Sequence, residues 1–200
     1  MAEPIDFYFD FSSPYGYFMS EKIDGIAAGF GRKVRWHPIL LGVVYTVSEG
    51  KPLTDLPLKG DYAVRDIARS ARFHGVDFAP PTPFPIATQA PARAFYWLHE
   101  QDCALARRFA HAAYRAYFKL GRDISSPEVV VDIADSLGAD GKALAEALKS
   151  EPVKARLKAA CNEAIAKGVF GSPFVIIDGE PFWGVDRLPQ IERWLDTGGF

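Results

Sequence analysis

Ser13 stands in a setting where a hydroxyl group can assist chemistry. It opens the tetrapeptide Ser-Pro-Tyr-Gly at 13–16, directly after an apolar run that is typical of a buried strand. As a helix N-cap, its oxygen would accept a backbone N–H, and Pro14 would occupy the first helical position, where its missing N–H costs nothing. The pattern predicts an exposed serine at a strand-to-helix turn, where open α/β sheets bind ligands. A helix N-terminus also favours an anion such as a thiolate.

Other common chemistries find little support in the chain. The four histidines fall on separate segments without ligand spacing, so no metal site is predicted. Cys103 and Cys161 lie far apart within helical patterns, which favours reduced thiols over a disulfide or a zinc site. Neither a Gly-x-Ser-x-Gly elbow nor a complete phosphate-binding loop occurs.

The composition is that of an ordinary globular protein, with 48% hydrophobic and 24% charged residues in 200. The formal net charge is -2 and both signs are scattered, so nucleic acid is not an expected partner. No segment approaches the ~20 consecutive apolar residues of a membrane-spanning helix, and no membrane association is expected. The first six residues are acidic where a signal peptide would be positive, which predicts a cytoplasmic protein.

The N-terminal part reads as a strand, a helix and a second strand. Residues 5–11 are rich in aromatic and β-branched residues and predict a buried strand. Apolar residues then recur at helical spacing from 14 until a Gly-Phe-Gly stop at 29–31, and residues 34–41 predict another strand. Such a βαβ unit builds a parallel sheet.

The middle of the chain has a different character. Residues 42–60 contain several glycines and prolines and predict a loop. Residues 61–74 return to a helical pattern. Four prolines within 79–85 exclude regular structure there. From about 91 to 167 the chain is rich in alanine and predicts a block of four or five helices.

The C-terminal part returns to strands. Asp-Gly at 178–179 between apolar runs predicts a β-hairpin, and an amphipathic helix follows. Its expected inner face consists of Leu188, Ile191, Trp194 and Leu195. The predicted fold class is therefore α/β, a thioredoxin-like sheet with a large all-helical insertion. The thioredoxin-like domain would comprise 1–41 and 168–200, and the helical insertion 42–167.

Three signatures in the right order carry a family resemblance. The Ser-Pro-Tyr-Gly segment at 13–16 occupies the place of the Cys-x-x-Cys of DsbA-like thioredoxin-fold proteins, although both cysteines are absent. Gly-Ser-Pro-Phe at 171–174 resembles the segment that bears the cis-proline of that fold, and Phe-Trp-Gly-Val-Asp-Arg-Leu at 182–188 completes the set. From the first strand to the last helix, the chain resembles the 2-hydroxychromene-2-carboxylate isomerases and the related kappa-class glutathione transferases.

The resemblance implies glutathione as the cofactor and Ser13 as the catalytic residue. The serine would hydrogen-bond the bound thiol and favour its thiolate, helped by the positive end of the first helix. A serine stabilises sulfur without forming a mixed disulfide, whereas a cysteine would give a redox site. Thiol–disulfide exchange is accordingly disfavoured.

The resemblance also implies which residues hold glutathione. If Pro173 is cis, the backbone of Ser172 can pair with the extended tripeptide; the alternative is an ordinary trans proline at a strand start. Asp186 would receive the γ-glutamyl ammonium, although an aspartate at this point could also cap a helix. Lys59 would meet the glycyl carboxylate, although an isolated lysine is usually only solvated.

The chain departs from the family at two of these contacts. Gly50 stands where relatives often have asparagine, and Val185 stands where they often have serine or asparagine before the aspartate. Each change removes a side-chain contact worth about 1 kcal/mol, so together they would weaken glutathione binding about tenfold or more. Val185 nevertheless remains a predicted cofactor-binding position.

The function implied is that of a glutathione-dependent isomerase acting on a small aromatic carboxylate. It would interconvert 2-hydroxychromene-2-carboxylate and trans-o-hydroxybenzylidenepyruvate by thiolate addition, bond rotation and elimination. The candidates for an aromatic substrate wall are Tyr15, Tyr45, Phe84 and Trp183. Two alternatives stay open, a transferase that conjugates glutathione to small electrophiles and a non-catalytic thioredoxin-like binding module. The resemblance further suggests a homodimer.

Overall fold

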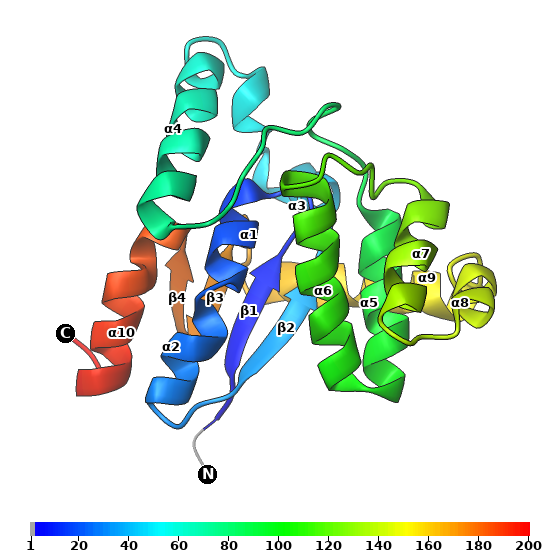
Figure 1. The fold of residues 1–200 in the computed structure, drawn as a ribbon. Coiled ribbons are helices and arrows are strands. Elements are labelled where there is room, and N and C mark those ends of the chain that lie inside the picture. The colour runs from blue at the N-terminus through cyan, green and yellow to red at the C-terminus, as the bar shows by residue number, and fades with distance from the viewer. Residues whose placement is uncertain (1–2) are drawn as a thin grey trace.

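The sheet combines two strands from the N-terminal part of the chain with two strands from the C-terminal part. The computed structural model describes residues 3–200, so the first two residues of the predicted thioredoxin-like domain lie outside the described residues. Four strands follow the order β2-β1-β3-β4 (Figure 1). They are β1 (Ile5–Phe9), β2 (Val34–Pro38), β3 (Phe174–Ile177) and β4 (Glu180–Trp183). β1 pairs parallel with β2 and antiparallel with β3, so the turn after β1 meets the segment before β3 at one end of the sheet.

Ten α-helices and two short 3-10 helices surround this sheet in residues 3–200. They are α1 (Pro14–Ser20), α2 (Ile23–Gly29), α3 (Leu41–Ser48), η1 (Leu53–Asp55), α4 (Lys59–His74), α5 (Gln89–Gln101), α6 (Cys103–Phe118), α7 (Pro127–Ser136), α8 (Gly141–Ala147), α9 (Glu151–Ala166), η2 (Val185–Arg187) and α10 (Leu188–Thr197). Figure 1 shows α1 and α2 in front of the sheet, α9 behind it, and α4 projecting above it. None of these helices is long and apolar enough to cross a membrane.

Aromatic side chains join the sheet to the helical block. Phe7 and Phe9 lie on one face of β1, and both make edge-to-face contacts with Trp36 of β2, with ring centroids 5.2 and 5.4 Å apart. Phe9 also contacts Phe95 of α5 and Tyr114 of α6. All five side chains are buried. Because these rings interlock, the strand that leads to Ser13 is held firmly from one face.

Most of the predicted elements are confirmed. The hairpin between β3 and β4 turns at Asp178 and Gly179, both at positive φ, as a tight two-residue turn requires. The Ser172–Pro173 peptide bond is cis. Helices α5 to α9 supply the predicted helical block, and no regular structure occurs in 79–85. The division into two domains stays a prediction.

The segment after the second strand was predicted wrongly. The strand ends at Pro38 rather than at residue 41, and the expected loop at 42–60 contains helix α3 and the 3-10 helix η1. The physical reason is tertiary, because the Asp10 carboxylate accepts the Leu41 N–H at 2.7 Å and so satisfies a free donor at the start of α3. α3 then packs against α9, which lies far away in sequence.

The helix after Ser13 is also interrupted. The single helical pattern from 14 to 29 forms two helices, and the break falls at Glu21 and Lys22. The Glu21 carboxylate at this break pairs with Arg115 of α6 at 2.8 Å and lies 3.3 Å from the His111 ring nitrogen. The interruption thus coincides with an ion pair to a distant helix.

Candidate functional site

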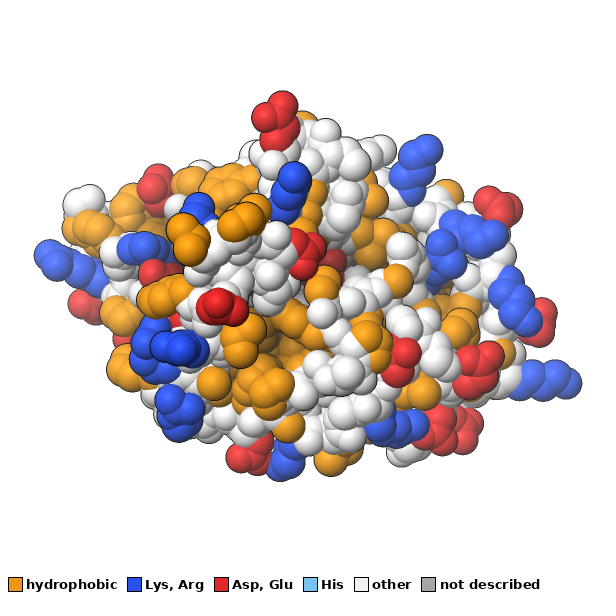
Figure 2. All heavy atoms as spheres, turned by 90° about the horizontal axis from the view of Figure 1, so that it is seen from above, with side chains coloured by type: hydrophobic (Ala, Val, Ile, Leu, Met, Phe, Trp, Pro, Cys, Tyr) orange, Lys and Arg blue, Asp and Glu red, His pale blue; other side chains and the backbone are white. Residues whose placement is uncertain are grey.

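An open cleft of about 1950 Å³ lies at the end of the sheet where β1 leads into Ser13. Its walls come from α1, α3, α4 and the segments before β3 and after β4. Figure 2 shows the molecule from above, with hydrophobic side chains gathered around a hollow near the centre. Pockets for drug-sized ligands occupy roughly 300–1,000 Å³, so this cleft has room for two small ligands together.

Ser13 is the N-cap of α1, as predicted, but it is not exposed. Its Oγ accepts the Gly16 N–H at 3.0 Å and donates to the Ser172 carbonyl oxygen at 3.0 Å. Only 5% of Ser13 is accessible, because the segment before Pro173 covers it from the other side of the cleft. The residue still lines the cleft. Its hydroxyl proton is therefore held by a main-chain carbonyl that a ligand could replace.

Ser172 lies next to Ser13, and its backbone N–H is available to a ligand. Its Oγ accepts the Asp10 N–H at 2.9 Å, and its carbonyl accepts the Ser13 hydroxyl. The hydrogen bonds within residues 3–200 provide no acceptor for the Ser172 N–H. Together with the cis Pro173, it lines the cleft. A peptide-like ligand would satisfy that donor.

Asp10 organises the turn that carries Ser13, and sequence reasoning did not identify it. Its buried carboxylate accepts the Ser12 N–H at 2.8 Å, the Leu41 N–H at 2.7 Å and the Thr88 hydroxyl at 2.8 Å. Burial raises the pKa of Asp10, and these three hydrogen bonds act in the opposite direction. The available signal was an aspartate at the end of an apolar run. One side chain therefore joins β1, α3 and the start of α5.

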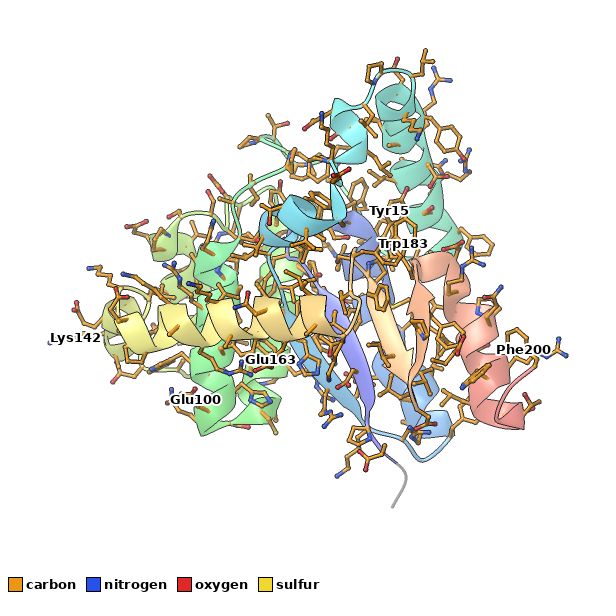
Figure 3. The ribbon with its side chains drawn as sticks, turned by 180° about the vertical axis from the view of Figure 1, so that it is seen from behind. Tyr15, Glu100, Lys142, Glu163, Trp183 and Phe200 are labelled. Atoms are coloured by element: carbon orange, nitrogen blue, oxygen red, sulfur yellow. The ribbon has the colours of Figure 1, made fainter. Side chains whose placement is uncertain are left out.

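The four aromatic residues predicted to form a wall all line the cleft. They are Tyr15, Tyr45, Phe84 and Trp183. Figure 3 labels Tyr15 on α1 and Trp183 on β4 at the same end of the sheet. Phe170, which the sequence did not single out, joins them with its ring centroid 4.9 Å from that of Trp183. Their contact with a substrate stays a prediction.

Two glycines let these rings lie against the backbone. A Cβ at Gly171 would overlap the Trp183 indole, and a Cβ at Gly50 would overlap the Tyr45 ring. The departure at Gly50 therefore has a local reason, because any side chain there would displace Tyr45. The Tyr45 ring thus fills the space that a side chain at residue 50 would need.

The residues predicted to bind the ends of glutathione are placed unequally. Asp186 lines the cleft with its side chain 69% exposed and pairs with Arg187 at 3.1 Å. The alternative role of Asp186 as a cap does not hold for α10, whose N-cap is Arg187. Val185 also lines the cleft and is buried. Lys59 is exposed at the first residue of α4 and lies outside the lining, whereas Lys51 belongs to it.

α4 adds a polar group of residues that the sequence did not point to. Asp66, Arg69 and Tyr62 line the cleft opposite Tyr15, and the Tyr15 hydroxyl donates to Asp66 Oδ2 at 2.6 Å. Asp66 also contacts the Arg69 guanidinium. No spacing in the sequence signals this group, since Tyr15 and Asp66 are 51 residues apart.

Comparison with known proteins identifies the family. The chain belongs to the family with a DsbA-like thioredoxin domain, which matches residues 4–196. It is 28% identical over 197 residues to a 2-hydroxychromene-2-carboxylate isomerase of Sphingobium xenophagum, covering 98% of this chain and 99% of that protein. It is 29% identical over 205 residues to glutathione S-transferase kappa 2 of Caenorhabditis elegans, covering 96% and 91%.

A solved structure agrees with these relatives. A selenomethionine form of 2-hydroxychromene-2-carboxylate isomerase superposes with a TM-score of 0.87 at 26% identity, covering 97% of this chain and 95% of that one. The predicted fold and resemblance are thereby confirmed. Because the relatives are named as isomerases and glutathione transferases, they support an enzyme of one of these kinds.

Proposed function

We propose that the protein is a glutathione-dependent isomerase of the 2-hydroxychromene-2-carboxylate type. The observation that carries the proposal is the Ser13 hydroxyl, which lines the cleft and donates to the Ser172 carbonyl at 3.0 Å beside the cis Pro173. The isomerase relatives at 26–28% identity support the same reaction. The proposal includes the cytoplasm as the compartment and a homodimer as the assembly, as expected from the sequence.

The cleft suits glutathione in three respects. The Ser172 N–H, which has no acceptor among the described residues, offers a main-chain contact for the tripeptide. The exposed Asp186 carboxylate offers a partner for the ammonium group of the γ-glutamyl end. The Ser13 hydroxyl lines the same cleft and can turn from the Ser172 carbonyl to a sulfur atom. When bound, glutathione would supply a thiolate nucleophile for the conjugated system of the substrate.

The residues of the chain would prepare this reaction by exchanging hydrogen bonds. As the Ser13 hydroxyl turns to the sulfur, it lowers the thiol pKa by stabilising the charged form. The Ser172 carbonyl, once released, can accept an amide N–H of the tripeptide. The aromatic wall would exclude water and orient the flat substrate, so that proximity contributes to the rate. No residue needs to change its redox state.

A kappa-type transferase is the second candidate, favoured by 29% identity to the C. elegans enzyme. Both candidates use the same thiolate, but the isomerase returns free glutathione and the transferase retains it in a conjugate. Product analysis by mass spectrometry after incubation with 2-hydroxychromene-2-carboxylate separates them. A non-catalytic module would bind no glutathione at all.

The test is a calorimetric glutathione titration with the wild type and Ser13→Ala, combined with the ultraviolet absorbance of the bound thiolate as a function of pH. We expect glutathione to bind to both proteins and the thiolate signal at neutral pH to disappear in the variant. We also expect turnover to fall about 100-fold, the usual loss on removing one donor to a reacting anion.

Ser126→Ala is the matched control, because Ser126 caps α7 through the Val129 N–H and does not line the cleft. It should cost about 1 kcal/mol of stability, as the loss of a serine cap does, without changing the thiolate signal. Absence of glutathione binding to the wild type at millimolar concentration would refute both enzymatic candidates.

A further inference from the structure

Tyr15 and Asp66 form a hydrogen-bonded pair across the cleft, between the first turn of α1 and the middle of α4. The Tyr15 hydroxyl lies 2.6 Å from Asp66 Oδ2, and both residues line the cleft. The Tyr15 ring is half-buried and packs edge-on against Phe18, which fixes its position. Tyr15 lies only two residues beyond Ser13. Both residues line the same cleft, so a ligand that fills the cleft can contact both.

The charges around the pair determine the direction of the hydrogen bond. Burial alone would raise the pKa of Asp66, but the hydrogen bonds from Tyr15 and Arg69 lower it, so the carboxylate is ionised and can only accept. Burial and the neighbouring Asp66 raise the pKa of Tyr15, so its phenol stays protonated. The single hydroxyl proton of Tyr15 is thus committed to Asp66.

The two tyrosines next to Asp66 differ in how their hydroxyl groups are used. The Tyr62 hydroxyl donates to Asp66 Oδ1 at 3.4 Å and accepts from Arg69 Nη2 at 3.0 Å, so it is used in both directions. For the Tyr15 oxygen, the hydrogen bonds of residues 3–200 include no donor. Tyr15 therefore presents a hydrogen-bond acceptor to the cleft, although tyrosine is usually able to donate.

We propose that Tyr15 determines substrate specificity by accepting a hydrogen bond from a hydroxyl group on the aromatic substrate, with Asp66 fixing the direction. This inference rests on the proposed function and names the group that the site recognises. Both isomers in the proposed reaction carry such a donor, a hemiketal hydroxyl in the ring form and a phenol in the open form. A carboxylate or phenolate has no proton to donate and is disfavoured at this point. The carboxylate of the substrate must accordingly point away from Tyr15.

The experiment compares two ligands that differ only in this hydroxyl. The dissociation constants of trans-o-hydroxybenzylidenepyruvate and of benzylidenepyruvate are measured below the pKa of the phenol. S-methylglutathione replaces glutathione so that no turnover occurs. For the wild type we expect the hydroxylated ligand to bind about fivefold more tightly, the effect of one neutral hydrogen bond. In Tyr15→Phe the ratio should fall to about one, since the oxygen that accepts from the ligand is removed together with its hydrogen bond to Asp66.

Two further variants separate this role from a general effect on the cleft. Tyr62→Phe is the matched control and should keep the wild-type ratio, because the Tyr62 oxygen already accepts from Arg69 and its proton goes to Asp66. Asp66→Asn should lower the ratio, because its amide can donate to Tyr15 and release the tyrosine proton toward the ligand. A wild-type ratio in Asp66→Asn would overturn the role of Asp66.

The outcomes distinguish the inference from the proposed function. If the wild type binds both ligands equally, or if Tyr15→Phe keeps the ratio, the inference is overturned while the isomerase proposal stands. If Tyr15→Phe instead weakens S-methylglutathione binding and leaves the ratio unchanged, Tyr15 serves the cofactor and the inference is overturned. If the wild type binds neither ligand, both the inference and the proposed function are overturned.

Discussion

Asp6 and Asp10 lie four residues apart at the two ends of the first strand segment, yet the protein stabilises their carboxylates in opposite ways. Asp6 is surrounded by basic side chains: Arg35 Nε and His37 Nε2 lie 2.9 and 2.8 Å from its Oδ1, and Lys167 Nζ lies 3.4 Å from its Oδ2. Within residues 3–200, Asp10 accepts hydrogen bonds from two backbone N–H groups and one hydroxyl and has no charged partner.

The pKa values reflect this difference. Burial alone would raise the pKa of Asp6, but His37, Arg35 and Lys167 lower it to about 2. The pKa of Asp10 is raised, because burial outweighs its neutral hydrogen bonds. Ion pairs suit the far end of the strand, where the partners reach water. Neutral donors suit the cleft, because they position Ser13 without adding a positive charge that would compete for a bound anion.

The largest expected effect comes from Asp10→Ala. This change leaves the Thr88 hydroxyl and the N–H groups of Ser12 and Leu41 without their acceptor inside the protein. We expect a loss of about 4 kcal/mol in the free energy of unfolding, measured by urea denaturation. Thr88→Val, which removes a single donor, should cost only about 1 kcal/mol. Equal losses in the two variants would contradict the central role of the carboxylate.

Asp6→Asn should have an intermediate effect that depends on pH. Since the folded-state pKa of about 2 lies below the unfolded value of about 3.9, ionised Asp6 stabilises the protein by about 2 kcal/mol at neutral pH. This stabilisation is complete above about pH 5 and is lost as the pH falls through about 2. The difference in unfolding free energy between wild type and variant should therefore shrink in acid.

For Asp10→Asn, the difference in unfolding free energy from the wild type should change with pH in the opposite direction. Because the folded-state pKa of Asp10 is raised, its ionisation opposes folding, and that cost is relieved as the pH falls through the folded-state pKa. In acid, the free energy of unfolding of the wild type should therefore rise relative to that of Asp10→Asn. Relative to that of Asp6→Asn, it should fall. Parallel pH profiles for the two variants would show that the two carboxylates do not differ as described.

The smallest effect is expected for Arg35→Ala. The Arg35 side chain is half-exposed, and Asp6 keeps His37 and Lys167 when it is removed. Such pairs contribute about 0.5 kcal/mol and weaken further in salt. Urea denaturation at low and high ionic strength checks both statements. A loss as large as that of Asp6→Asn would mean that one ion pair, rather than the cluster, stabilises Asp6.

Local patterns were sufficient for much of the fold. The Asp178-Gly179 turn, the capping position of Ser13 and the proline-rich segment at 79–85 each follow from the conformational preferences of a few neighbouring residues. Local patterns fail to predict α3, because its first N–H donates to the carboxylate of Asp10, 31 residues away. A helix stabilised by a distant carboxylate leaves no sign in its own sequence.

The candidate site divides in the same way. Two of its parts, Ser13 and the cis Pro173, stand in short motifs that can be read from the sequence. Its side-chain partners could not be read, because the Tyr15–Asp66 and Asp10–Thr88 hydrogen bonds join residues 51 and 78 positions apart. The burial of Ser13 likewise depends on Ser172, 159 residues away.

By itself, the sequence determined the order of most elements, the position of the capping serine and the family resemblance, because capping, turn formation and hydrophobic periodicity act over a few residues. Only the tertiary structure decided which groups surround that serine. The antiparallel pairing of β1 with β3 brings Ser172 to Ser13, and the packing of α4 against α1 turns the Tyr15 hydroxyl toward Asp66. The direction of a hydroxyl proton depends on its nearest acceptor, and here that acceptor comes from elsewhere in the chain.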